Sequence, residues 1–181
     1  MELRKWVQEL MIYSPDALST DEAKEAKASA AGAWTLDIEP ANSIADVNLA
    51  LKRYVNLRRV TFCTHGFSGG VSFKGGSITN VTLSRLVIPR NLFKGEGQLL
   101  FMGCETARNE SGREFLKAVG RKFFAGTGGV VGGATVSVIG WSSGSVLPFL
   151  TLNGNAMPER GNLVLFRLDA DGTVIGQSVV R

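Results

Sequence analysis

Short apolar blocks alternate with longer amphipathic blocks along this chain, and the two kinds of block predict different elements. Runs rich in Val, Ile, Phe and Leu that end at turn residues predict strands over 6–13, 34–38, 59–64, 98–102 and 128–138. The residues at 59–64 and 98–102 suit burial on both faces of a sheet, which is typical of parallel strands.

In the longer blocks, apolar residues recur at helical spacing. They predict helices over 20–31, about 43–55, 82–92 and 111–124. The first helix has Thr20 or Asp21 as its expected N-cap, and the second has Asn42 or Ser43. Pro89 interrupts the third helix. The apolar stripe of the fourth consists of Phe115, Leu116, Val119 and Phe123.

Glycine-rich turns predict two hairpins, a small one over 69–79 and one at the carboxyl end that pairs 163–168 with 173–180. The alternation of strands and helices predicts an α/β fold with a mostly parallel central sheet, helices on both faces and an antiparallel C-terminal hairpin. At 181 residues, we expect a single domain over 1–181.

Composition excludes several classes of function. The net charge is +4, but the Lys and Arg residues are scattered, so we expect no nucleic-acid partner. No apolar stretch approaches the ~20 residues of a membrane span, and no secretory signal is visible. Two cysteines make no disulfide framework, so we expect a cytoplasmic protein or one delivered without a signal peptide. One histidine and two cysteines also argue against a zinc site, and no cofactor is expected.

The candidate chemistry lies just beyond two of the predicted strands. His65, the one histidine, follows the strand at 59–64, and Cys104 follows the strand at 98–102. Ligands of such sheets bind at the carboxyl ends of the strands, so both side chains are expected on one rim. A histidine base raises the thiolate fraction of a cysteine, and the thiolate attacks a carbonyl carbon. The backbone N–H groups of Gly66 and Cys104 are the expected oxyanion hole.

The order Thr64-His65-Gly66, then a strand, then Gly103-Cys104-Glu105-Thr106-Ala107 resembles the caspase-like cysteine peptidases, including the bacterial CHAT-type and separase-related branches. The resemblance extends from about Arg59 to Val136. It implies a three-layer caspase-hemoglobinase fold and endopeptidase activity on a protein or peptide substrate. By position, His65 is then the general base and acid, Cys104 the nucleophile and Gly66 an oxyanion donor.

Four further residues are weaker candidates for substrate binding, namely Met102, Glu105, Trp141 and Ser142. Met102 stands where caspases have Gln and metacaspases Asp, so neither an acidic nor a basic P1 preference carries over from that position. Glu105 either binds a basic group or an attacking amine, or it caps the following helix or faces solvent. Cys63 is either a buried structural thiol or a redox partner of Cys104.

Two other functions stay open at this point. The first is a catalytically inactive interaction module on the same fold. The second is a thiol acyltransferase or deamidase that uses the same dyad on side-chain amides. Such enzymes usually add an Asp, Asn or Gln partner to the dyad, and the sequence does not single one out.

Overall fold

The computed structural model of the protein describes residues 7–30, 35–136 and 163–180. Its strands are β1 (Glu9–Tyr13), β2 (Leu36–Pro40), β3 (Leu57–Cys63), β4 (His65–Phe67), β5 (Gly70–Phe73), β6 (Gly76–Thr79), β7 (Phe93–Phe101), β8 (Gly129–Ala134), β9 (Leu163–Leu168) and β10 (Val174–Val180). Its helices are α1 (Thr20–Ala30), α2 (Ile44–Lys52) and α3 (Asn109–Phe123), with a short 3-10 helix η1 (Leu83–Arg85).

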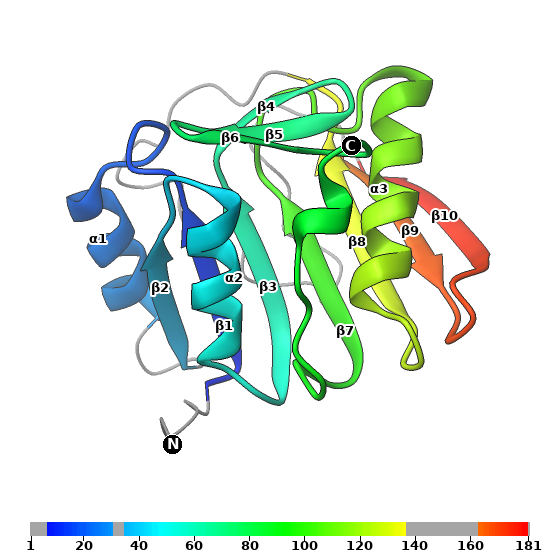
Figure 1. Ribbon diagram of the computed structural model, residues 1–181, viewed down its shortest axis with the longest axis horizontal. Helices are drawn as coiled ribbons and strands as arrows, with labels where there is room; N and C mark the ends of the chain where they lie inside the picture. The colour runs from blue at the N-terminus through cyan, green and yellow to red at the C-terminus, as the bar shows by residue number, and fades with distance from the viewer. Residues whose placement is uncertain (1–6, 31–34, 137–162, 181) are drawn as a thin grey trace.

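Seven of the described strands form one sheet in the order β10-β9-β8-β7-β3-β1-β2. The strands from β2 to β8 in this order run parallel, whereas β9 lies antiparallel to both β8 and β10. A second sheet, β4-β5-β6, is antiparallel and lies across the end of the large sheet (Figure 1). The predicted mostly parallel sheet with an antiparallel C-terminal hairpin is therefore confirmed.

Side chains alternate along each strand, so both faces of the large sheet carry apolar residues. Described helices cover each of these faces. Ile12 and Phe62 point into a core with residues of α2 and α3, where the Phe62 ring stacks on Phe101 at 5.1 Å between centroids. Met11 and Cys63 point to the opposite face, into a second core cluster that includes Ala23 and Ala26 of α1. In Figure 1, α2 and α3 lie in front of the sheet.

Two helix predictions are confirmed in detail. The side chain of Ser43 caps α2 by accepting a hydrogen bond from the N–H of Asp46. The four residues of the predicted α3 stripe, Phe115, Leu116, Val119 and Phe123, are all buried. For α1, neither Thr20 nor Asp21 is the cap. Ser19 takes that place, because its hydroxyl accepts from the N–H of Glu22 while the Glu22 carboxylate accepts from the N–H of Ser19.

The prediction of a helix over 82–92 is wrong, because only η1 is helical there. Two physical causes oppose a helix. Val87 and Ile88 are β-branched, and Ile88 precedes Pro89, which disfavours the helical region. In addition, the amide of Asn48 on α2 donates to the carbonyl of Arg85 and accepts from the N–H of Val87, which ties the segment to α2 in an irregular conformation.

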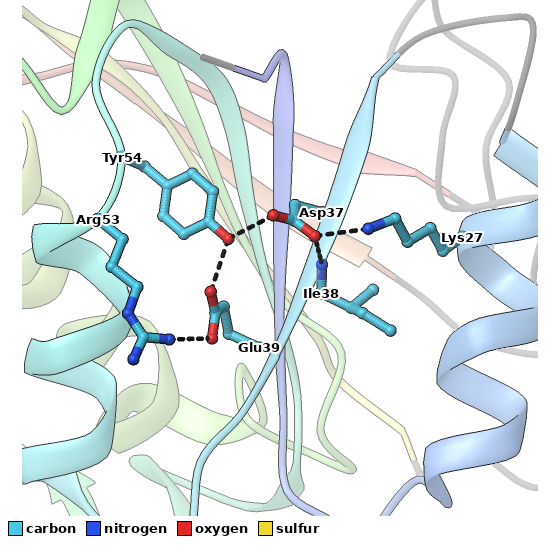
Figure 2. Close-up of polar contacts among 6 residues, drawn as sticks. All are labelled: Lys27, Asp37, Ile38, Glu39, Arg53 and Tyr54. Atoms are coloured by element: carbon cyan, nitrogen blue, oxygen red, sulfur yellow. Dashed lines mark hydrogen bonds and ion pairs between the residues drawn. The ribbon is translucent and has the colours of Figure 1, made fainter. Parts of the chain in front are cut away.

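The edge strand β2 is held to the helices by a polar cluster around the buried Tyr54 (Figure 2). The hydroxyl of Tyr54 lies 2.8 Å from Asp37 Oδ2 and 2.7 Å from Glu39 Oε1. Arg53 pairs with Glu39 and Lys27 pairs with Asp37, each at 2.7 Å. Two carboxylates and two cations therefore balance around one fully buried tyrosine.

Candidate functional site

Three neighbouring parallel strands end together and position the candidate residues. Tyr13 of β1 lies beside Cys63 of β3, and Phe62 of β3 lies beside Phe101 of β7. The segments that follow these strands carry Asp16, His65 and Cys104. The expected placement of the histidine and the cysteine after adjacent strand ends is thus found, and the segment after β1 adds a carboxylate.

His65 differs from the prediction in its local structure. It lies in β4, where it pairs with Ser72 of β5. The sequence pattern at 59–64 does not indicate that the chain passes from one sheet to another here. Strand β3 ends at Cys63, and a new strand begins two residues later in the other sheet. The antiparallel sheet holds the backbone of His65, while its side chain is 58% exposed.

The segments that carry His65 and Cys104 touch through their glycines. A Cβ at Gly103 would lie 2.8 Å from the Cα of Gly66 and 2.9 Å from its amide nitrogen. A Cβ at Gly66 would in turn overlap the carbonyls of Gly103 and Cys104. Only glycine permits so close an approach of two backbones. His65 and Cys104 each lie one residue from this contact.

Backbone hydrogen bonds fix the Cys104 segment between its neighbours. The N–H of Met102 donates to the carbonyl of Phe62 in β3 at 2.8 Å. On the other side, the N–H of Glu105 donates to Val136 and that of Ala107 to Ala134, at 3.0 and 2.8 Å. Cys104 is half-buried and forms no disulfide.

Ser68 connects the β4–β5 hairpin, which carries His65, to helix α3, which follows Cys104. The Ser68 hydroxyl, just after β4, donates to the carbonyl of Arg108 and lies 2.7 Å from the hydroxyl of Ser111 in the first turn of α3. This bond and the glycine contact connect the same two segments at different points. The two backbone segments that carry His65 and Cys104 are therefore held together by more than one contact.

Asp16 is the residue that sequence reasoning missed. Its Oδ2 lies 3.7 Å from Nε2 of His65. The pKa of its carboxyl is lowered, first by a hydrogen bond from the Ser14 hydroxyl and further by its own backbone N–H and by the charges of His65 and Lys74. No motif marks this aspartate, since its proximity to His65 depends on β1 pairing with β3.

The other predicted residues lie in different surroundings. Met102 is 3% exposed and packs in the second core cluster with Met11 and Leu100. Glu105 adopts a positive φ of 55° and pairs with Arg108 at 2.7 Å. Trp141 and Ser142 lie outside the described residues. The N–H groups of Gly66 and Cys104, which are expected to form the oxyanion hole, lie in the two segments that touch at Gly66 and Gly103.

Cys63 is a buried structural thiol in this structure. It is 2% exposed in the second core cluster, and burial raises its pKa to about 12. Within the described residues, no group of three or more His, Cys, Asp or Glu side chains is arranged to hold a metal ion. No helix in that part of the chain is long and apolar enough to cross a membrane.

Comparison with known proteins gives one family. Residues 19–127, more than half of the chain, match the family described as a domain of unknown function, DUF4347, and the chain belongs to this family. The matched region includes both His65 and Cys104. No curated protein matches the chain. No solved structure matches it either.

Proposed function

We propose that this protein is a cysteine endopeptidase of the caspase-like kind, with His65 and Cys104 as its catalytic dyad. The observation that carries the proposal is the backbone contact between Gly66 and Gly103. It joins a His-Gly segment after one strand to a Gly-Cys segment after the neighbouring strand, at the rim where α/β sheets bind their ligands. A parallel sheet with helices on both faces supports the caspase-hemoglobinase fold as the finer assignment.

The chemistry proceeds by acyl transfer. His65 takes the proton of the Cys104 thiol, and the sulfur forms a bond to the peptide carbonyl carbon while the carbonyl electron pair moves onto oxygen. The N–H groups of Gly66 and Cys104 stabilise this oxyanion. When the electron pair returns, the C–N bond breaks and the amine leaves with the proton from His65. Water, deprotonated by His65, then attacks the thioester and releases the acid and the thiol.

The test is cleavage of a positional-scanning peptide library by four purified proteins. Wild type is expected to cut a subset of the peptides, and Cys104→Ala and His65→Ala are expected to lose the activity. Cys63→Ala is the matched control, because it removes the other thiol, which is buried in the second core cluster, and it should retain activity. Cleavage by Cys104→Ala at the wild-type rate would exclude the mechanism.

Product mass separates the alternatives. A backbone cut gives two fragments, whereas a deamidase leaves the peptide whole and about one mass unit heavier through the same acyl-enzyme chemistry. An interaction module gives neither product, and its Cys104 would react with iodoacetamide at pH 6 no faster in wild type than in His65→Ala. Each of these results would replace the endopeptidase assignment.

A further inference from the structure

We propose that Asp16 is a positioning residue for His65, one that holds the imidazole and favours its protonated form when the Cys104 thiol ionises. The inference rests on the proposed function of the dyad. It assigns a third residue, which follows β1, to a site whose other two residues follow β3 and β7.

The contact has the geometry of an ion pair that strengthens with charge. The Asp16 Oδ2 to His65 Nε2 distance of 3.7 Å is longer than a hydrogen bond, but it lies within the range of an ion pair. A neutral imidazole gains little from this neighbour. An imidazolium, which forms when the thiol gives up its proton, gains directly from the adjacent carboxylate. Asp16 therefore acts on the charge-separated state of the dyad.

Asp16 is itself held in place. The Ser14 hydroxyl donates to Oδ1 of Asp16, so one carboxylate oxygen binds Ser14 and the other faces His65. Ser14 is fully buried, and its N–H donates to the carbonyl of Cys63 at the end of β3 at 3.0 Å. The carboxylate is thus connected through Ser14 to the strand that leads to His65.

The orientation of the ring follows from this contact. With Nε2 turned toward Asp16, Nδ1 is the nitrogen that remains for proton exchange with the thiol. Because the His65 side chain is 58% exposed, few packing contacts select its rotamer, and a fixed carboxylate supplies that selection. Of the groups around Asp16, Lys74 is cationic and favours its ionised state, and His65 does so when it is protonated.

The test measures the rate at which iodoacetamide alkylates Cys104 between pH 5 and 8, in a Cys63→Ala background with one thiol. Iodoacetamide is small and neutral, so the readout needs no substrate. Asp16→Asn is expected to slow alkylation near pH 6 about three- to ten-fold, with the fall on acidification beginning at a higher pH. Asp16→Glu should restore part of the rate. Asp21→Asn, with the same charge change on a side chain that is 96% exposed, should match wild type.

A double mutant separates positioning from a structural role. In His65→Ala, which is itself slow, adding Asp16→Asn should change nothing further, because Asp16 acts through the imidazole. Equal slowing by Asp16→Asn with and without His65 would overturn the inference, and so would a wild-type profile. A wild-type profile with lost cleavage of basic peptides would make Asp16 a substrate contact instead.

The outcomes also separate this inference from the proposed function. Dependence of alkylation on both His65 and Asp16, without cleavage of any peptide, upholds the inference and rejects the peptidase. Dependence on His65 alone upholds the dyad and rejects the role of Asp16. Alkylation that is independent of His65 rejects both.

Discussion

At the scale of single residues, the site depends on two glycines that let two backbones touch. A Cβ at Gly66 would lie 2.6 Å from Thr106 Oγ1 and would also overlap backbone carbonyls that cannot rotate away. Thr106 is fully buried and bonded to the carbonyl of Gly103, so it has little room to move. The contact therefore offers no space for even one methyl group.

Gly66→Ala is accordingly expected to lower the free energy of unfolding by about 1–3 kcal/mol, through overpacking against fixed backbone. It should also slow alkylation of Cys104 by displacing its segment. Urea unfolding measures the first effect. Gly176→Ala is the control, since its Cβ would meet its nearest neighbour at an ordinary 3.7 Å and should change stability by less than about 0.5 kcal/mol. Equal stability of the two variants would contradict the packing argument.

The two cysteines are expected to differ sharply in reactivity. Burial raises the pKa of Cys63 to about 12, so almost no thiolate is present at neutral pH, and the core shields the sulfur. Iodoacetamide at pH 7.5 should therefore add one label per folded molecule, at Cys104, and a second only after unfolding in urea. Mass spectrometry of digested protein locates the labels. Labelling of Cys63 in the folded protein at a rate similar to Cys104 would disprove its protection.

At the scale of elements, Tyr54 joins the edge strand β2 to the end of α2. Its phenol has one proton and two carboxylate neighbours, so it donates to one of them at a time while Arg53 and Lys27 offset their charges. Tyr54→Phe removes the donor and leaves buried acceptors, at an expected cost of about 1–3 kcal/mol. Tyr13→Phe is the control, because its hydroxyl makes a single long contact of 3.4 Å and should cost less.

The same cluster predicts a pH dependence. Burial first, and then the hydrogen bonds to Glu39 and Asp37, raise the pKa of Tyr54 above its ordinary value near 10. The folded state keeps this proton longer than the unfolded state does. The stabilisation is therefore complete below about pH 10 and decreases as the pH rises further. Urea midpoints from pH 8 to 11 should show wild type losing its advantage over Tyr54→Phe; parallel curves would contradict this.

Elements with strong local signals were predictable, and those set by distant contacts were not. Helix α3 has an unbroken apolar stripe, and the α2 cap uses a serine followed by an aspartate three residues later. Strand β4 was missed, because nothing in Thr64-His65-Gly66 separates the end of one strand from the start of another. Strand β7 begins at Phe93, before the strand predicted over 98–102, and its pairing with β3 shifts register before Gln98 to accommodate the extra residues.

At the scale of the whole molecule, the sequence predicted the rim but not all of its residues. Parallel neighbours place His65 and Cys104 on adjoining segments, and that follows from two strand signals and a general rule for α/β sheets. The position of Asp16 beside His65 depends on the strand order β7-β3-β1, and no local sequence pattern encodes that order. The position of Met102 before the cysteine made it a candidate for substrate binding. Its side chain instead packs in the second core cluster.

The three strands that end at the site are also joined by a row of polar residues within the sheet. Glu9, Arg59 and Gln98 lie in register across β1, β3 and β7. Arg59 is 1% exposed; its Nη1 lies 3.3 Å from Glu9, and its Nε donates to Gln98 at 3.1 Å. Burial raises the pKa of Glu9 and lowers that of Arg59, although each partner opposes the change. Desolvation thus exceeds the mutual attraction, as is common for buried ion pairs.

Breaking this row should therefore cost more than removing it. Glu9→Leu leaves a buried guanidinium without its carboxylate and should lower the free energy of unfolding by about 3–5 kcal/mol. Glu9→Leu with Arg59→Met replaces both charges by apolar groups and should recover most of that loss. Arg58→Met, at an exposed neighbouring position, is the control for the lost positive charge. Urea unfolding of wild type, Glu9→Leu, Arg59→Met and the double variant forms a double-mutant cycle, and additive losses would contradict the coupling of the pair. Recovery in the double variant would mean that apolar packing alone is enough to hold β1, β3 and β7 together without the row.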